Sequence, residues 1–159
     1  CTKASPKCLQ CPLHNDCAAF ASDSAASFPK RKPRRAAEKL WWASLVQENA
    51  GRVLLVQNAP GDWWSGLWDF PRLEAQAAET VDSDVRERLL EEPHLEFQRA
   101  LPLQEHTVTH HRIRVSPIVL CWSGKPRSGK NQRWVSPEDA AKLPLSSLAK
   151  KILGSYQRE

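Results

Sequence analysis

The chain has 159 residues, of which 41% are hydrophobic, enough for one ordinary domain with a core and an appendage. No apolar run approaches the roughly eighteen residues of a membrane helix, and five cysteines are too sparse for a disulfide-stapled secreted fold, so we expect a cytoplasmic protein with no membrane segment. The formal net charge of +5 favours an anionic partner.

The first seventeen residues, CTKASPKCLQCPLHNDC, contain four of the five cysteines. Structural zinc sites usually combine two short cysteine hairpins, whereas here only Cys8 and Cys11 form such a hairpin. A 4Fe–4S cluster has a larger core that tolerates the unequal spacings to Cys1 and Cys17. The spacing therefore favours an iron–sulfur cluster, with zinc as the alternative. Because the chain contains no methionine and begins on a cysteine of this pattern, we expect it to be part of a longer protein.

Residues 18–38 are small and polar, then basic and interrupted by prolines, which is the composition of a linker. Such a basic run is more often a solvated linker than a ligand contact, and any function would be to lie along phosphates. Its charged residues are Lys30, Arg31, Lys32, Arg34 and Arg35. We therefore divide the chain into a cysteine loop at 1–17, a linker at 18–38 and a folded domain at 39–159.

The folded domain mixes strand and helix patterns. Strands are expected at 40–47, 52–58, 112–122 and 132–136, and helices at 76–92, from Ser136, and at 146–156. Pro117 inside one of these strands favours an edge position or a bulge. Cys121, in the same strand, is expected to be a free thiol. This order predicts an α/β (α+β) domain with a mixed sheet and helices on its faces.

The cysteine pattern C-x6-C-x2-C-x5-C, followed directly by Pro12 and Leu13, resembles the cluster motif of the helix-hairpin-helix DNA glycosylases. The resemblance implies a chiefly structural 4Fe–4S cluster that closes a helical catalytic domain preceding Cys1. Its ligands would be Cys1, Cys8, Cys11 and Cys17. It also implies that Lys3 and Lys7, between the first two ligands, contact the DNA backbone.

The rest of the chain resembles the Nudix-like extension of the adenine DNA glycosylases. GLWDFP at 66–71 is similar to the family's glycine-leucine-tryptophan-x-phenylalanine-proline segment, and HTVTH at 106–110 to its histidine-threonine-phenylalanine-serine-histidine loop. The resemblance implies that this loop recognises 8-oxoguanine, with Thr109 in the place of the family's serine and Val108 in that of its phenylalanine. The residues so implicated are Thr107, Val108, Thr109 and His110.

The family resemblance implies base excision repair: removal of adenine mispaired with 8-oxoguanine. The implied partner is double-stranded DNA containing A:8-oxoguanine or A:G mispairs, and the protein would act as a monomer associated with the bacterial nucleoid. The family's catalytic carboxylates would lie before Cys1, so no residue of this chain is assigned to catalysis. The chain alone should be inactive as a hydrolase.

Two other classes of function remain open. A Nudix hydrolase of nucleoside diphosphate derivatives needs a glycine pair and a helix of magnesium-binding glutamates. The chain has PRLEAQAAET in place of those glycines, and Glu87, Glu91 and Glu92 do not keep the required spacing, so they are interpreted as a solvated helix face. A zinc-containing nucleic-acid binding module is the third class.

Tryptophans and histidines near these motifs allow further interpretations. Trp68 is expected in the core, whereas Trp63 could be core or part of a base-stacking platform with Trp64. His106, His110 and His111 are not expected to bind a metal, because no carboxylate or cysteine lies at ligand spacing in the sequence.

Overall fold

The computed structural model describes residues 5–28, 30, 33 and 35–158, which fall into two compact units divided between Ala36 and Ala37. The first unit consists of single helical turns, as its proline-broken, cysteine-punctuated sequence requires. These turns are η1 (Cys8–Gln10), η2 (His14–Asp16), α1 (Ala18–Ala21) and η3 (Ala25–Ser27).

One mixed sheet dominates the second unit and contains eight strands within the described residues. The strands are β1 (Glu38–Asn49), β2 (Arg52–Gln57), β3 (Trp68–Asp69), β4 (Arg72–Ala75), β5 (Leu95–Ala100), β6 (Gln104–Val108), β7 (His111–Trp122) and β8 (Gln132–Val135). The long strands β1 and β7 pair in parallel from Glu38 opposite His111 to Glu48 opposite Cys121. The other named strand pairs are antiparallel.

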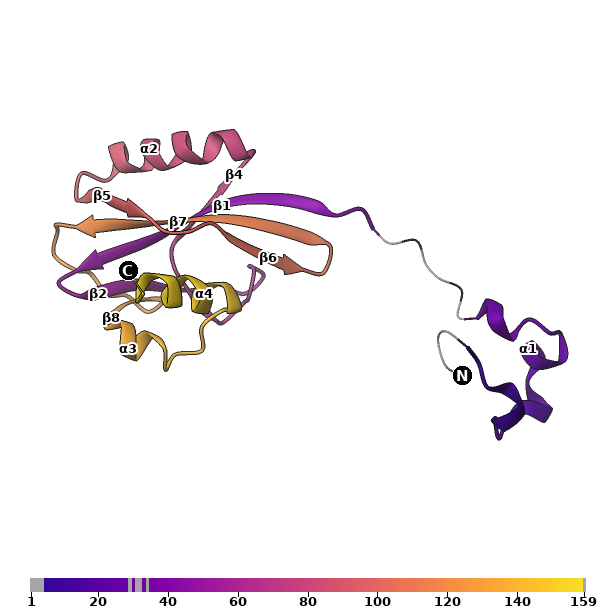
Figure 1. Ribbon diagram of the computed structural model, residues 1–159. Coiled ribbons are helices and arrows are strands. Elements are labelled where there is room, and N and C mark those ends of the chain that lie inside the picture. Colours follow the sequence, from indigo (N-terminus) through magenta and orange to yellow (C-terminus); the bar gives the residue numbers. More distant parts are fainter. Residues whose placement is uncertain (1–4, 29, 31–32, 34, 159) are drawn as a thin grey trace. The chain divides into compact units, whose positions relative to one another are not determined.

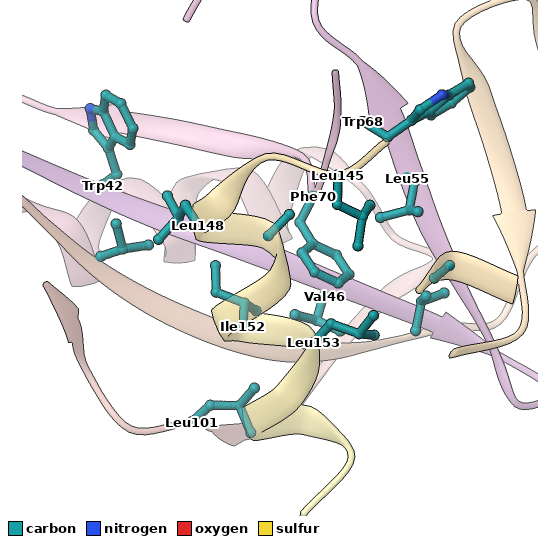
Figure 2. Close-up of a cluster of buried hydrophobic side chains, with 14 of the residues drawn as sticks. Trp42, Val46, Leu55, Trp68, Phe70, Leu101, Leu145, Leu148, Ile152 and Leu153 are labelled. Carbon is teal, nitrogen blue, oxygen red and sulfur yellow. The ribbon is translucent and has the colours of Figure 1, made fainter. Parts of the chain in front are cut away.

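Helices cover both faces of the sheet (Figure 1), with α2 (Val81–Glu91) on one face and α4 (Ser147–Tyr156) on the other. Successive residues of the central strands point to opposite faces of the sheet, where they belong to two separate hydrophobic cores. Trp42 and Val46 of β1 pack with Leu148 and Ile152 of α4 (Figure 2). Leu45, on the opposite face of β1, belongs to the cluster beneath α2. This arrangement confirms the predicted α+β class with a mixed sheet.

The helices begin where their sequences supply caps. The Ser136 hydroxyl accepts the Asp139 N–H at the start of α3 (Pro137–Ala140), and the Ser146 hydroxyl accepts the Ala149 N–H at the start of α4. The helix predicted at 76–92 begins later than expected, because residues 78–80 form the 3-10 turn η4 (Ala78–Thr80) before α2. In the described chain, no helix has the length and apolar character needed to cross a bilayer.

The prediction that Pro117 marks an edge strand is wrong, and the bulge in the β5–β7 ladder lies between Phe97 and Arg99 of β5 rather than at Pro117. Strand β7 has β1 on one side and both β5 and β6 on the other. Pro117 lies at the break between those two partners, where its carbonyl accepts the N–H of Leu101 in the β5–β6 connection. The missing proline N–H points to the same side, so no ladder bond is lost there.

Candidate lesion-recognition site and cysteine pocket

The HTVTH motif forms the end of a β-hairpin. Strand β6 pairs with β7 as far as Val108 opposite His111, which leaves Thr109 and His110 as the two-residue turn. Thr109 has a φ of 53°, a left-handed conformation that is uncommon for a β-branched residue and costs about 1–3 kcal/mol. The fold therefore holds an exposed threonine in a strained conformation at the tip of the hairpin.

The side chains of the turn are polar and accessible. The Thr109 hydroxyl lies 3.2 Å from Nδ1 of the half-buried His110. Thr107 is exposed, whereas Val108 packs against the core beneath α4. A hydroxyl both donates and accepts hydrogen bonds, so the tip can pair with a donor or an acceptor on a ligand. Thus the structure brings Thr107, Thr109 and His110 to one accessible end and uses Val108 for packing.

One face of the hairpin carries an aromatic cluster. Trp63 packs edge-on against His111 at 5.0 Å between ring centroids, and Trp64 against His106 at 5.5 Å. Both tryptophans also contact Trp42, at 5.5 and 5.9 Å. Trp63 and Trp64 are half-buried, and both pack against the main core. Both tryptophans therefore pack against the hairpin and the core, and do not stand free as a platform on which bases could stack.

The loop that presents these tryptophans is held by its own backbone. The Asn58 N–H donates to the Leu67 carbonyl and the Gly66 N–H to the Asn58 carbonyl. Gly66 has a φ of 79°, which glycine adopts without strain. Trp68, which follows the loop, is only 4% exposed, as predicted.

The other face of the hairpin borders a basic pocket that sequence reasoning missed. Its volume is about 440 Å³, and its charged lining residues are Lys39, Glu105, Arg112 and Arg114. The Glu105 carboxylate accepts a hydrogen bond from Arg114 at 2.8 Å. Among these four lining residues, no carboxylate then remains to pair with Lys39 or Arg112. Burial, and secondarily the charge of Lys151, lower the pKa of His106 at the edge of this pocket. The alternation of Arg112 and Arg114 in β7 was the sequence signal for this surface.

The three described cysteines of the first unit line one pocket. Cys8, Cys11 and Cys17 are free, half-buried thiols that border a cavity of about 330 Å³. The Cys11 N–H donates to the Cys8 carbonyl, and the Cys17 N–H to that of His14, so the loop curls around the cavity. Three thiols facing one hollow are a donor set suited to an iron–sulfur cluster or zinc. Cys1 lies outside the described residues.

The predicted phosphate contacts are only partly within the described chain. Lys7 is exposed at the rim of the cysteine pocket, and Lys30 and Arg35 are exposed. Outside the described residues lie Lys3, Arg31, Lys32 and Arg34. Cys121, by contrast, is located in β7 as a free thiol, as predicted.

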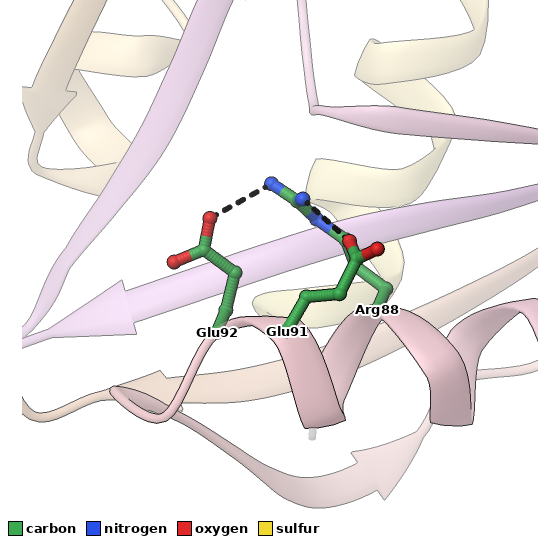
Figure 3. A network of polar contacts seen from close by, with 3 residues as sticks. All are labelled: Arg88, Glu91 and Glu92. Carbon is green, nitrogen blue, oxygen red and sulfur yellow. Dashed lines mark hydrogen bonds and ion pairs between the residues drawn. The ribbon is translucent and has the colours of Figure 1, made fainter.

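Two glutamates at the C-terminal end of α2, Glu91 and the capping residue Glu92, pair with an arginine (Figure 3). Arg88 contacts Glu91 at 3.3 Å and Glu92 at 3.1 Å, and Glu87 is exposed. Within residues 5–28, 30, 33 and 35–158, α2 adds no member to a group of three potential metal ligands. Exposed Glu87 agrees with the interpretation of a solvated helix face, and the structure adds the ion pairs of Glu91 and Glu92 with Arg88.

A carboxylate does lie beside the histidines, so the expectation that none would be available to a metal there is wrong. Glu38, at the start of β1, places its Oε2 3.2 Å from Nε2 of His111. Glu38, His110 and His111 present ligand atoms that all lie within 4.8 Å of one another. Local spacing could not reveal this group, because the parallel β1–β7 pairing joins residues more than seventy positions apart.

Comparison with known proteins agrees with this architecture. A family model described as NUDIX domain matches residues 41–155. Adenine DNA glycosylase from Buchnera aphidicola is 22% identical over 99% of this chain, and the chain spans 45% of that protein's length. The C-terminal domain of mouse MUTYH, solved in complex with human PCNA, aligns with a TM-score of 0.57 and 20% identity over 75% of this chain and 88% of that one.

A similar fold occurs in proteins of other descriptions. The E. coli ORF135 protein aligns with a TM-score of 0.59 and 19% identity over 80% of this chain and 94% of its own. A MutT NUDIX hydrolase from Burkholderia pseudomallei aligns with a TM-score of 0.58 and 20% identity over 74% of this chain and 98% of its own. The chain belongs to the NUDIX domain family and resembles the C-terminal, NUDIX-like region of the adenine DNA glycosylases.

Proposed function

We propose that this chain is the lesion-recognition region of an adenine DNA glycosylase that acts on double-stranded DNA containing A:8-oxoguanine or A:G mispairs. The observation that carries the proposal is the end-to-end similarity to adenine DNA glycosylase, which includes the cysteine segment as well as the NUDIX domain. The family's catalytic carboxylates are expected before Cys1. The chain alone is therefore expected to bind DNA without cleaving a glycosidic bond.

The hairpin has the chemistry that this recognition needs. Oxidation of guanine converts N7 from an acceptor to an N–H donor and adds a carbonyl oxygen at C8. The Thr109 hydroxyl can accept from that N–H, and backbone N–H groups at the turn can donate to the new oxygen. Lys39 and Arg112, in the basic pocket beside the turn, suit the flanking phosphates.

The cysteine pocket has the chemistry of a structural cluster site. Cys8, Cys11 and Cys17 would hold a 4Fe–4S cluster together with Cys1, and the cluster would supply a rigid centre for a loop without a core of its own. Lys7, at the rim of the same pocket, would then be fixed in a position to contact the DNA backbone. The family resemblance implies the same contact for Lys3, which lies outside the described residues.

The test is a binding comparison on the 159-residue chain. Affinity is measured for duplexes that differ only in guanine or 8-oxoguanine opposite adenine, at one fixed salt concentration. We expect tighter binding of the 8-oxoguanine duplex, by about 1–3 kcal/mol, the scale of one base-edge contact. Equal affinity for the two duplexes would contradict lesion recognition by this chain.

Hydrolysis of nucleoside diphosphate derivatives is a second candidate, because the NUDIX domain match covers most of the chain. The pairing of Arg88 with Glu91 and Glu92 weighs against it, since these carboxylates are engaged rather than directed at a shared cation. Magnesium-dependent release of phosphate or a nucleoside monophosphate from such substrates by the purified chain would favour this candidate.

A further inference from the structure

Three potential metal ligands lie together at the start of β1 and the tip of the β6–β7 hairpin. Glu38 Oε2 lies 3.2 Å from His111 Nε2, and the ligand atoms of Glu38, His110 and His111 are mutually within 4.8 Å. Tetrahedral zinc with bonds of about 2.0–2.1 Å separates its ligand atoms by about 3.3 Å. The glutamate and one histidine already lie at this separation, so only small side-chain rotations are needed to complete the group.

The backbone fixes the positions of all three residues. The Glu38 N–H donates to the His110 carbonyl at 3.0 Å, and Glu38 lies opposite His111 in the parallel β1–β7 ladder. Trp63 packs edge-on against the His111 ring at 5.0 Å and restricts its orientation. Ligands that are held in place before binding lose little freedom when the ion arrives.

The ring nitrogens are also arranged for coordination. Nδ1 of His110 faces the Thr109 hydroxyl at 3.2 Å, so the tautomer that donates this hydrogen bond leaves the Nε2 lone pair available. The rings of His110 and His111 lie with centroids 4.0 Å apart. Nδ1 of His111 is buried and has no hydrogen-bond partner in the described chain. Coordination by His111 would therefore use Nε2, the nitrogen that already faces Glu38 Oε2 at 3.2 Å.

We propose that Glu38, His110 and His111 bind a divalent transition-metal ion of the Zn²⁺ class. Two imidazole nitrogens and one carboxylate oxygen form a donor set that such ions favour, whereas Mg²⁺ and Ca²⁺ require mainly oxygen ligands. Three protein ligands leave one coordination position for water or another oxygen donor. The ion would join the start of β1 to the tip of the hairpin that carries Thr109.

The test follows the imidazole NMR signals of the 159-residue chain during addition of Zn²⁺ in the absence of DNA. Because the N-terminal thiols also bind zinc, the readout must resolve individual histidines. We expect the His110 and His111 rings to shift together at one equivalent beyond thiol saturation, while His94, remote in the sequence from this group, stays unchanged. Glu38→Gln should weaken this binding about tenfold or more.

Glu105→Gln is the matched control, because Glu105 is a similarly exposed carboxylate on the adjacent hairpin strand, 67% against 59% exposed for the Glu38 side chain. It should bind zinc like the unmodified chain. Equal affinities for the two variants, or zinc uptake by thiols alone with unmoved His110 and His111 signals, would overturn the proposal. An unchanged amide spectrum of Glu38→Gln establishes that it is folded. Since no DNA is present, neither result bears on lesion recognition.

Discussion

The hydroxyl of Thr109 lies 3.2 Å from Nδ1 of His110, at a turn where Thr109 adopts a φ of 53°. A strained conformation persists only where the surrounding structure imposes it, and such positions concentrate at functional sites. Here the β6–β7 pairing imposes the conformation, and the result is a hydroxyl directed away from the core. The strain and the exposure together identify Thr109 as the residue whose chemistry should be tested first.

Thr109→Val removes the hydroxyl and keeps the branched shape of the side chain. In the proposed function, we expect it to reduce the preference for 8-oxoguanine over guanine opposite adenine by about 1–3 kcal/mol. The measurement is the ratio of duplex affinities. Thr109→Ser, which retains the hydroxyl, should preserve the preference. If both variants discriminate as well as the unmodified chain, Thr109 is only a turn residue.

The cysteine pocket predicts a definite metal content. Anaerobic reconstitution of the chain should give about four irons and four sulfides per molecule if Cys1, Cys8, Cys11 and Cys17 hold a 4Fe–4S cluster. Cys8→Ser should lower the iron content, whereas Cys121→Ser should leave it unchanged, because Cys121 lies in β7 within the other unit. Stoichiometric zinc without bound sulfide would contradict the cluster and support a zinc site instead.

Lys7, exposed at the rim of that pocket, should contribute to DNA affinity without reading sequence. Each phosphate contact that is lost flattens the dependence of log affinity on log salt by about 0.9. Lys7→Ala should show this change in cluster-loaded chain binding to duplex DNA. Lys125→Ala, an exposed lysine in the loop that follows β7, is the comparison and should keep the original slope. An unaltered slope for Lys7→Ala would assign that lysine to the solvated surface.

Local sequence patterns predicted the elements that depend on local chemistry. The helices expected from Ser136 and from residue 146, and the strands expected on either side of residues 50–51, appear in the structure where their patterns indicated. Strands β3 to β6 were not predicted. Strands β3 and β4 are short, and β6 joins β7 through a Thr-His turn that lacks the glycine or asparagine typical of a two-residue hairpin. Glu38 could not be connected with His110 and His111 for a different reason: only the parallel pairing of β1 with β7 brings them together.

Pro117 shows how pairing on one side of a strand can override a local rule. Proline is disfavoured in a central strand because it has no N–H to donate to the ladder of hydrogen bonds. In β7 that position faces the gap between β5 and β6, so the strand remains central. Sequence alone could not locate this gap, since it depends on where two other strands end.

The turn between β1 and β2 offers a stability prediction. Ala50 and Gly51 have φ values of 48° and 74°, the left-handed pair of a type I′ turn. Asparagine tolerates this conformation better than alanine, so Ala50→Asn should stabilise the fold by about 0.5–1 kcal/mol. Ala50→Val should have the opposite sign, because branched residues disfavour positive φ. Urea unfolding of the two variants measures both values, and a shared sign would contradict the assigned turn.

Asp69 provides a prediction about pH. Its side chain is 3% exposed, and burial raises its pKa above the ordinary value despite hydrogen bonding from the Phe70 N–H at 2.9 Å. Because the folded state holds this proton more tightly than the unfolded chain, Asp69 favours folding at low pH. That contribution is lost as pH rises from about 4 through the raised pKa. At neutral pH, ionisation of this buried carboxyl should therefore lower the free energy of unfolding of the unmodified protein.

Asp69→Asn removes the ionisation while retaining an oxygen that can accept from Phe70. Its stability relative to the unmodified chain should therefore rise between pH 4 and pH 7, as measured by urea unfolding at each pH. Glu96→Gln, which changes an exposed carboxylate of β5, controls for the general effect of removing one negative charge and should show little pH dependence. A relative stability of Asp69→Asn that falls with rising pH would mean that charged Asp69 is stabilised by its surroundings. In that case its partners, among them Arg72 and Ser146, would outweigh the cost of burial.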